Sequence, residues 1–197
     1  YSVNVHTGAK RLIGRSYRTA PKWSVNGKWA VMYDPIAQVW NKFDGATGKV
    51  VNISDAIGYP MFVESYDKPA PAPAYGIAGW TADGNNVFLY DAYDWWKIDL
   101  TGERQPECLT KGYGRKHGKS IRKMTSNIDK DVFQKDEKVI VSLWDKDTMD
   151  EGVYQLDMKG RLRKLMEGNY VYTIHRFSDN HEYCVWNRQN VSEFRDC

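Results

Sequence analysis

The sequence predicts an all-β chain, a β-propeller segment built from four-stranded antiparallel blades. Three observations lead to this fold class. A module recurs along the chain, glycine turns recur at fixed positions of its copies, and apolar residues at helical spacing are nearly absent. Eight Trp and thirteen Tyr in 197 residues add to the argument, because large flat side chains suit pleated, half-buried surfaces.

The copies share an order of parts. WSVNGKWAVMYDPIAQVWNKFDGATGKVVNIS at 23–54 and WTADGNNVFLYDAYDWWKIDLTGERQPECLT at 80–110 each contain a Trp, a tight turn, a run ending in Tyr-Asp, a Trp-bearing run ending in Asp, and a glycine turn. Asp34 and Asp91 are 57 residues apart, and Asp145 of a third copy follows after 54 more. Four short strands with this period are typical of propeller blades. A β-sandwich with similar hairpins is the alternative.

The repeat predicts one continuous propeller segment over residues 1–197, with about three complete blades and two half-blades. Complete blades are expected at about 18–55, 75–110 and 121–167. Half-blades are expected at 1–14 and 173–197. The half-blades at the two ends allow two arrangements. The blades form either a small closed ring, in which 173–187 pairs with 2–14, or an open arc of a larger ring. We favour the arc, whose uncovered blade faces predict self-association of the isolated chain.

Turn and aromatic residues justify the strands within each blade. Asn26-Gly27 and Asp83-Gly84 are pairs that accept positive φ in tight turns. Turns from the third strand to the fourth are expected at Gly8, Gly48, Gly102 and Gly160. Recurrence at fixed positions predicts that four aromatic residues pack between blades: Trp23, Trp80, Tyr33 and Tyr90. In the adjacent pair Trp95-Trp96, alternation predicts that one ring is packed and the other more exposed.

A glycine-rich basic stretch, GYGRKHGKS at 112–120, ends like a phosphate-binding P-loop. The spacing excludes that motif, because the position of its first glycine holds Tyr113. Six Lys or Arg and no acid lie between Lys111 and Lys123. Two interpretations remain: a solvated connector between blades, which the near-balanced net charge favours, and a surface contact loop. A second connector, KPAPAPA at 68–74, is expected to be extended and solvated.

The contact interpretation would use three cations, Arg115, Lys116 and Lys119.

Composition excludes several classes of function. A net charge of +3 is too small to indicate a nucleic-acid partner. The cysteines Cys108, Cys184 and Cys197 and the four scattered histidines form no zinc pattern and no disulfide framework. The sequence therefore predicts no metal and no cofactor. No apolar run approaches the length of a membrane span.

The stretch PAYGIAGWTADGNNVFLYDAYDWWKIDLTGERQPECLTKGYGRK, residues 73–116, resembles the propeller region of prolyl oligopeptidase-type serine peptidases, especially bacterial members related to dipeptidyl peptidase IV. The resemblance rests on three motifs: Gly-Trp-Thr-x-Asp-Gly, Tyr-Asp before the Trp-Lys-Ile-Asp strand, and Leu-Thr-x-Gly-Tyr-Gly-Arg. RQNVSEF at 188–194 is similar to a further segment of the family.

The resemblance implies that the chain is a fragment whose propeller caps an α/β-hydrolase domain and restricts the access of a peptide substrate. It further implies a periplasmic or extracellular location. No catalytic residue can be assigned here, because Ser16 and Ser120 each lack the second glycine of the Gly-x-Ser-x-Gly nucleophile motif. The alternative function is a stand-alone propeller that binds a protein, peptide or glycan partner.

Overall fold

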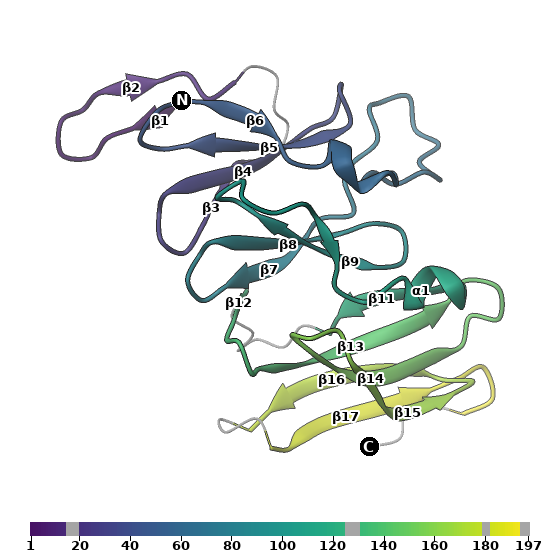
Figure 1. Cartoon of the computed structure of the whole chain (residues 1–197). Helices are drawn as coiled ribbons and strands as arrows, with labels where there is room; N and C mark the ends of the chain where they lie inside the picture. Colours follow the sequence, from purple (N-terminus) through teal and green to yellow (C-terminus); the bar gives the residue numbers. More distant parts are fainter. Residues whose placement is uncertain (15–19, 125–130, 179–181, 194–197) are drawn as a thin grey trace. The chain divides into compact units, whose positions relative to one another are not determined.

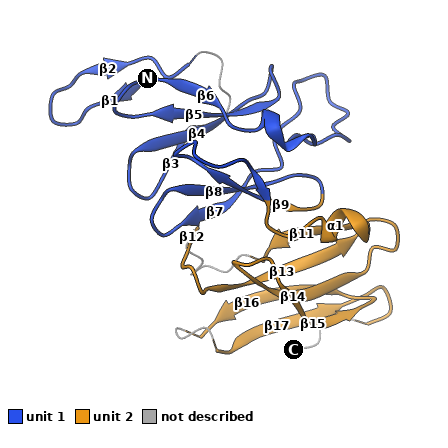
Figure 2. Ribbon diagram, viewed as in Figure 1, with its two compact units in different colours: residues 1–92, 96–107 blue, residues 93–95, 108–197 orange. Residues whose placement is uncertain are grey.

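A computed structural model describes residues 1–14, 20–124, 131–178 and 182–193. The chain divides into two compact units, residues 1–92 with 96–107 and residues 93–95 with 108–197 (Figure 2). The predicted fold class is confirmed: the described strands form three antiparallel sheets, each holding the four strands of one blade, and two two-stranded hairpins (Figure 1). Ser16 and Cys197 lie outside the described residues.

The first unit begins with the hairpin of β1 (Ser2–Val3) and β2 (Lys10–Arg11). The first complete sheet follows, in the order β3-β4-β5-β6. Its strands are β3 (Lys22–Trp23), β4 (Trp29–Asp34), β5 (Val39–Asp44) and β6 (Val50–Asn52), followed by a short 3-10 turn at Asp55–Ile57. The second sheet has five strands, and the four that form the second blade have the order β10-β9-β8-β7. These four are β7 (Ile77–Thr81), β8 (Asn86–Tyr90), β9 (Trp95–Asp99) and β10 (Glu107–Cys108).

The second unit contains the one-turn helix α1 (Tyr113–Lys116) and the third sheet, in the order β11-β13-β14-β15. The strands of this sheet are β11 (Lys119–Lys123), β13 (Lys138–Asp145), β14 (Glu151–Asp157) and β15 (Leu162–Gly168). The short strand β12 (Val132–Phe133) precedes β13. The C-terminal hairpin pairs β16 (Val171–Phe177) with β17 (Cys184–Gln189).

The core of the first unit lies between strands of the first sheet and strands of the second sheet. On β4, Trp29, Val31 and Tyr33 point into this cluster, where they meet residues of the second sheet such as Trp80 and Leu89. The alternate residues Ala30 and Met32 are buried on the opposite face, in a second cluster with Ile13 and Phe43. Strand β4 is therefore covered on both faces, as a blade with a neighbour on either side requires.

The turn predictions agree with the backbone. A positive φ is found at Gly27 and Gly84, and also at the four glycines predicted to join third and fourth strands, Gly8, Gly48, Gly102 and Gly160. Trp95 is fully buried while Trp96 is half-buried, which is the alternation that a strand imposes. Tyr33, Tyr90 and Trp80 are buried as predicted.

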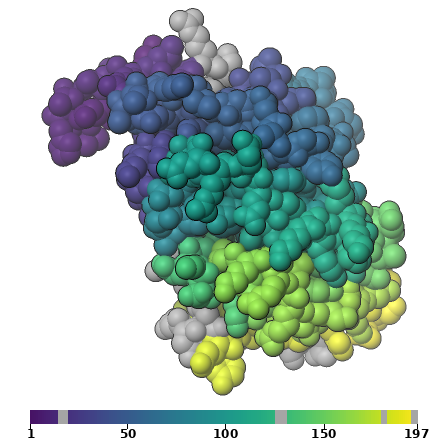
Figure 3. Space-filling view, in the orientation of Figure 1, coloured from purple at the N-terminus to yellow at the C-terminus, as the bar shows by residue number. Residues whose placement is uncertain are grey.

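Trp23 corrects the aromatic prediction, because it is 45% exposed while its counterpart Trp80 is only 5% exposed. Trp80 pairs with Val87, on the face that meets the preceding sheet. Trp23 pairs with Ala30 and so faces the N-terminal hairpin, which is the thin purple projection of the first unit (Figure 3). Two strands of two residues each cannot cover an indole ring.

One of the two connector interpretations is wrong, and the structure adds a detail to the other. The basic stretch is not a solvated loop, since it folds into α1 and the beginning of β11, and Gly114 and Ser120 within it are buried. The Pro-Ala segment is extended, but it is fixed against residues 61–63 by hydrogen bonds from the amide of Val63 to the carbonyl of Pro73 (2.8 Å) and from the amide of Tyr75 to that of Met61 (3.1 Å). Both segments have tertiary hydrogen-bond partners that a local pattern does not reveal.

No helix among the described residues is both long and apolar enough to cross a membrane.

Candidate functional site

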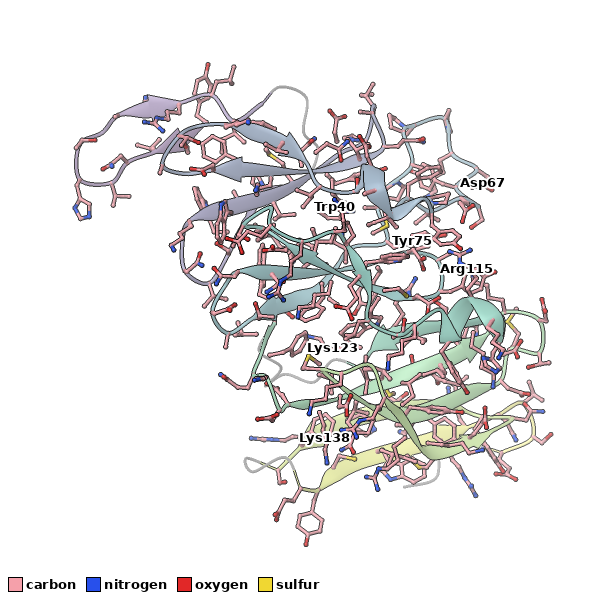
Figure 4. The ribbon with its side chains drawn as sticks, viewed as in Figure 1. Trp40, Asp67, Tyr75, Arg115, Lys123 and Lys138 are labelled. Carbon is pink, nitrogen blue, oxygen red and sulfur yellow. The ribbon has the colours of Figure 1, made fainter. Side chains whose placement is uncertain are left out.

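The three predicted contact residues lie on two short elements of the second unit. Arg115 and Lys116 belong to α1, and Lys119 begins β11 (Figure 4 labels Arg115). Lys116 is exposed, whereas Arg115 and Lys119 are partly buried. The Gly-Lys-Ser end of the stretch runs into a strand, where Ser120 is buried opposite Trp144. A P-loop would lead into a helix, so the exclusion of that motif holds.

A buried carboxylate fixes α1 in place. Asp94 is 1% exposed, and its Oδ1 accepts hydrogen bonds from the Thr110 hydroxyl (2.6 Å) and the Gly114 amide (2.9 Å). Its Oδ2 accepts from the Arg115 amide (3.0 Å). A carboxylate that accepts backbone N–H groups out of water makes strong, charge-assisted bonds. Asp94 therefore joins the end of the second blade's sequence to the helical turn that carries the predicted contact residues.

The close approach of α1 to Asp94 requires glycine at position 114. A Cβ atom there would lie 2.7 Å from the backbone oxygens of both Tyr93 and Lys119. No side chain fits at that distance, because both neighbours are backbone atoms of packed segments. The sequence alone did not single out Asp94. The Leu-Thr-x-Gly-Tyr-Gly-Arg motif could have indicated it, because Thr110, Gly114 and Arg115 of this motif donate hydrogen bonds to its carboxylate.

Cations gather on the ring of Tyr93 next to this turn. The Arg115 guanidinium carbon lies 5.1 Å from the ring centroid, and the Lys146 ammonium nitrogen lies 4.1 Å from it. Both distances are within the range of cation–π attraction. Lys116 is exposed on the same helical turn, so the surface around α1 presents several positive charges.

Lys119 belongs to a different cluster, centred on Glu167 of β15. The Lys119 ammonium lies 2.5 Å from Glu167 Oε1, and the Lys164 ammonium lies 3.0 Å from Oε2. The Tyr154 hydroxyl donates to Oε1 at 3.1 Å. These partners, Lys119 foremost, lower the pKa of Glu167 to about 2, and the same contact raises the pKa of Lys119. An anionic ligand would have to compete with Glu167 for Lys119.

The structure therefore separates the predicted contact residues into two groups. Arg115 and Lys116 share a turn fixed by Asp94, and this turn is suited to a charge-based contact with an acidic surface or ligand. Lys119 serves an internal ion pair that joins β11 to β15. Lys146, which sequence reasoning did not select, joins the first group through Tyr93.

The chain matches no model of a known protein family, and comparison with curated proteins finds no significant relative.

Proposed function

We propose that this chain is a non-catalytic portion of the β-propeller of a bacterial prolyl oligopeptidase-type serine peptidase. In this proposal the blades form a scaffold for an α/β-hydrolase domain outside residues 1–197. They also restrict the entry of the peptide substrate, and the protein works in the periplasm or outside the cell.

One observation carries the proposal. The stretch that resembles the family, residues 73–116, runs from the start of the second blade to the end of α1, and its motif residues have identifiable structural roles. Trp80 is buried between sheets, and the carboxylate of Asp91 accepts a 3.0 Å hydrogen bond from the indole N–H of Trp96. Asp94 accepts from the Thr110 hydroxyl and from two backbone amides of the Gly-Tyr-Gly-Arg turn, those of Gly114 and Arg115. A resemblance in residues that shape a blade is what a shared propeller would leave in a sequence.

The first experiment determines the sequence of the open reading frame beyond Cys197 and assays the full-length protein for peptidase activity. We expect a Gly-x-Ser-x-Gly motif followed by an Asp and a His, and cleavage of a dipeptidyl p-nitroanilide substrate that is abolished when the motif serine is changed to Ala. A stop codon shortly after residue 197, or a folded full-length protein without such a motif, would exclude the proposal.

A second candidate function, a propeller that binds an acidic partner, is favoured by the cations around α1. The test compares the double variant Arg115→Gln/Lys116→Gln with Lys135→Gln/Lys159→Gln, which removes two exposed charges elsewhere in the chain. The probe is a fluorescein-labelled peptide rich in glutamate. Binding that weakens with salt and is lost only in the first variant supports this function; equal binding by both variants refutes it.

A further inference from the structure

A pocket of about 350 Å³ lies in the first unit, between the N-terminal hairpin and the first blade. We call it the Trp23 pocket. Ser2, Asn4 and Arg11 line it from the hairpin, and Trp23 lines it from β3. Its volume is in the range of sites that hold small molecules. Solvent reaches the two largest side chains of its wall, because Arg11 is exposed and Trp23 is 45% exposed.

The indole of Trp23 is held in place as one wall of this pocket. Its ring meets Phe43 edge to face, with 6.2 Å between the ring centroids and 83° between the ring planes. The turn at Gly45 also packs closely against it, since a Cβ at this glycine would lie 3.2 Å from Cζ3 of the Trp23 ring. At Gly27, which also lines the pocket, a Cβ would meet nothing within 4 Å. The pocket therefore combines a fixed aromatic surface with open space.

Arg11 provides a fixed positive charge at the same pocket. Its Nη1 donates from the hairpin to the carbonyls of Ala46 (2.6 Å) and Gly45 (3.4 Å) in the turn between β5 and β6. These bonds restrict the side chain but use one of its three nitrogens, and a guanidinium has further N–H groups that match a carboxylate. Among the described residues that line the pocket, Arg11 is the charged one. The pocket is therefore suited to an anionic group.

The surrounding charges also favour an anion. Residues 1–33 contain six Lys or Arg and no Asp or Glu. Clustered charges of one sign raise the local concentration of ligands of the opposite sign. The first acid after Asp34 is Asp44, next to the pocket residue Gly45. Its Oδ1 accepts from the backbone amides of Ala46 (2.9 Å) and Thr47 (2.8 Å), and it does not line the pocket.

The end of β1 adds uncharged hydrogen-bonding groups. Asn4 Oδ1 accepts from the backbone amides of His6 (2.9 Å) and Thr7 (3.0 Å), which fixes the Asn4 side chain and leaves its NH₂ group as a donor. The hydroxyl of Ser2 is a further donor and acceptor in the lining. A ligand with hydroxyl groups can pair with both side chains, whereas a purely aromatic acid cannot.

We propose that the Trp23 pocket binds an acidic sugar, a uronic acid, whose carboxylate pairs with Arg11 and whose ring stacks through its C–H face on Trp23. The sugar hydroxyls would then meet Ser2 and Asn4. A flat apolar surface beside converging polar groups is the combination that a sugar ring requires, because the ring has an apolar face and a polar rim. All these residues belong to the first unit, so the inference depends neither on the proposed peptidase function nor on the cations around α1.

The experiment measures binding by NMR in two ways, through the Trp23 resonances of the isotopically labelled chain and through saturation transfer to the ring protons of the ligand. Trp23→Phe assigns the indole. The probes are glucuronate and galacturonate, their neutral counterparts glucose and galactose, and benzoate. At least one uronate should move the Trp23 resonances in a saturable way and bind about tenfold more tightly than its neutral counterpart, as expected for a charge-assisted pair. Added salt should weaken this binding, and benzoate should bind less tightly than the uronate.

Three variants complete the test. Arg11→Gln should abolish the preference for the uronate over the neutral sugar. Lys10→Gln is the matched control, because it removes the neighbouring charge on the same strand from an exposed residue outside the pocket lining, and it should leave binding unchanged. Trp23→Ala should abolish saturation transfer to every sugar, which keeps the proposal testable if Arg11→Gln loosens the hairpin. The proposal is overturned if neither uronate moves the Trp23 resonances, if Lys10→Gln weakens binding as much as Arg11→Gln, or if benzoate binds as tightly as the uronates.

Discussion

At the level of single residues, two buried carboxylates hold neighbouring segments in positions that the hydrophobic pattern does not predict. Asp94 and Asp91 are both almost fully buried, and each accepts a donor from a neighbouring segment: Thr110 and the α1 amides for Asp94, and the Trp96 indole for Asp91. In the sequence, these two residues are only acidic positions close to Trp95 and Trp96. The donors come from residues up to 21 positions away, as for the Arg115 amide, and nothing in the local pattern pairs them.

We expect Asp94→Asn to lower the free energy of unfolding by about 2–4 kcal/mol, because a neutral amide cannot accept all three hydrogen bonds and turns an NH₂ group toward backbone amides. Urea denaturation measures the change. Asp34→Asn is the matched control, since Asp34 Oδ1 accepts from the amides of Ile36 and Ala37 in an exposed turn that asparagine can reproduce. Equal effects of the two substitutions would contradict the role assigned to Asp94.

Glu167 gives the chain a pH-dependent contribution to stability. Its pKa is lowered from 4.5 to about 2 in the folded state, chiefly by Lys119. A lowered pKa stabilises the fold above the unfolded value, and that stabilisation is lost as the pH falls from about 4.5 toward 2. Glu167→Gln should therefore cost about 1 kcal/mol at pH 7, since the cluster is partly solvent-exposed.

The cost of Glu167→Gln should shrink toward zero near pH 2. Unfolding curves of the wild type and the variant at pH 7, 4 and 2.5 test this, and Glu64→Gln, an exposed position outside the cluster, is the control. A cost that is the same at all three pH values would show that Glu167 acts through packing and not through its charge.

At the level of the elements, strands and turns were predictable because they depend on local rules. Alternating burial on β4, and positive φ at the repeated glycines, follow from residue type and spacing. Helix α1 and the beginning of β11 at Lys119 were not predictable in this way. Their positions depend on Asp94 and on pairing with β13, which are tertiary contacts.

The apolar pocket of the first unit, which Tyr33 and Trp40 line, could not be predicted from the sequence either. Its wall is a Pro-Ala segment that reads as a solvated connector, and only the structure reveals that Ala72 accepts from Tyr33. Trp40 reads as one more core aromatic residue, and its unsatisfied indole N–H becomes visible only beside Trp95.

The two tight turns of the first unit provide a matched pair for testing blade-to-blade packing. Gly27 and Gly84 both have φ +69, but a Cβ at Gly27 would meet nothing within 4 Å, while one at Gly84 would lie 2.7 Å from the backbone nitrogen of Asn26. The side-chain amide of Asn26 also donates a hydrogen bond to the backbone carbonyl of Asp83 at 2.9 Å. The two turns thus contact each other across the sheets.

Gly27→Ala should cost about 1 kcal/mol, from backbone strain alone. Gly84→Ala should cost at least about 1 kcal/mol more, because the added methyl group also displaces Asn26. Thermal and urea unfolding give both values. If the two substitutions have equal costs, the turns do not pack against each other in solution.

At the level of the whole molecule, the terminal hairpins leave apolar side chains uncovered. Val171, Tyr183 and Val185 of the C-terminal hairpin region are exposed, as are Tyr1 and Val5 at the N-terminus. Exposed apolar side chains beside sheet edges promote association. The all-β fold class followed from the repeat, but the repeat does not say whether anything covers these side chains.

We therefore expect the isolated chain to self-associate reversibly as its concentration rises, and Val185→Thr to weaken that association. Light scattering coupled to size exclusion measures both. Val25→Thr, which changes an exposed valine on a turn of the first blade, is the control and should have no effect. A strict monomer at every concentration would contradict the prediction.

The assignment to a serine peptidase is tested by labelling the full-length gene product, and separately the chain 1–197, with a fluorophosphonate probe, followed by mass spectrometric mapping of the modified residue. We predict one labelled serine in the full-length protein, located outside residues 1–197, and no label on the isolated chain. A folded full-length protein that takes no label, or a label on a serine within these residues, would contradict the proposal.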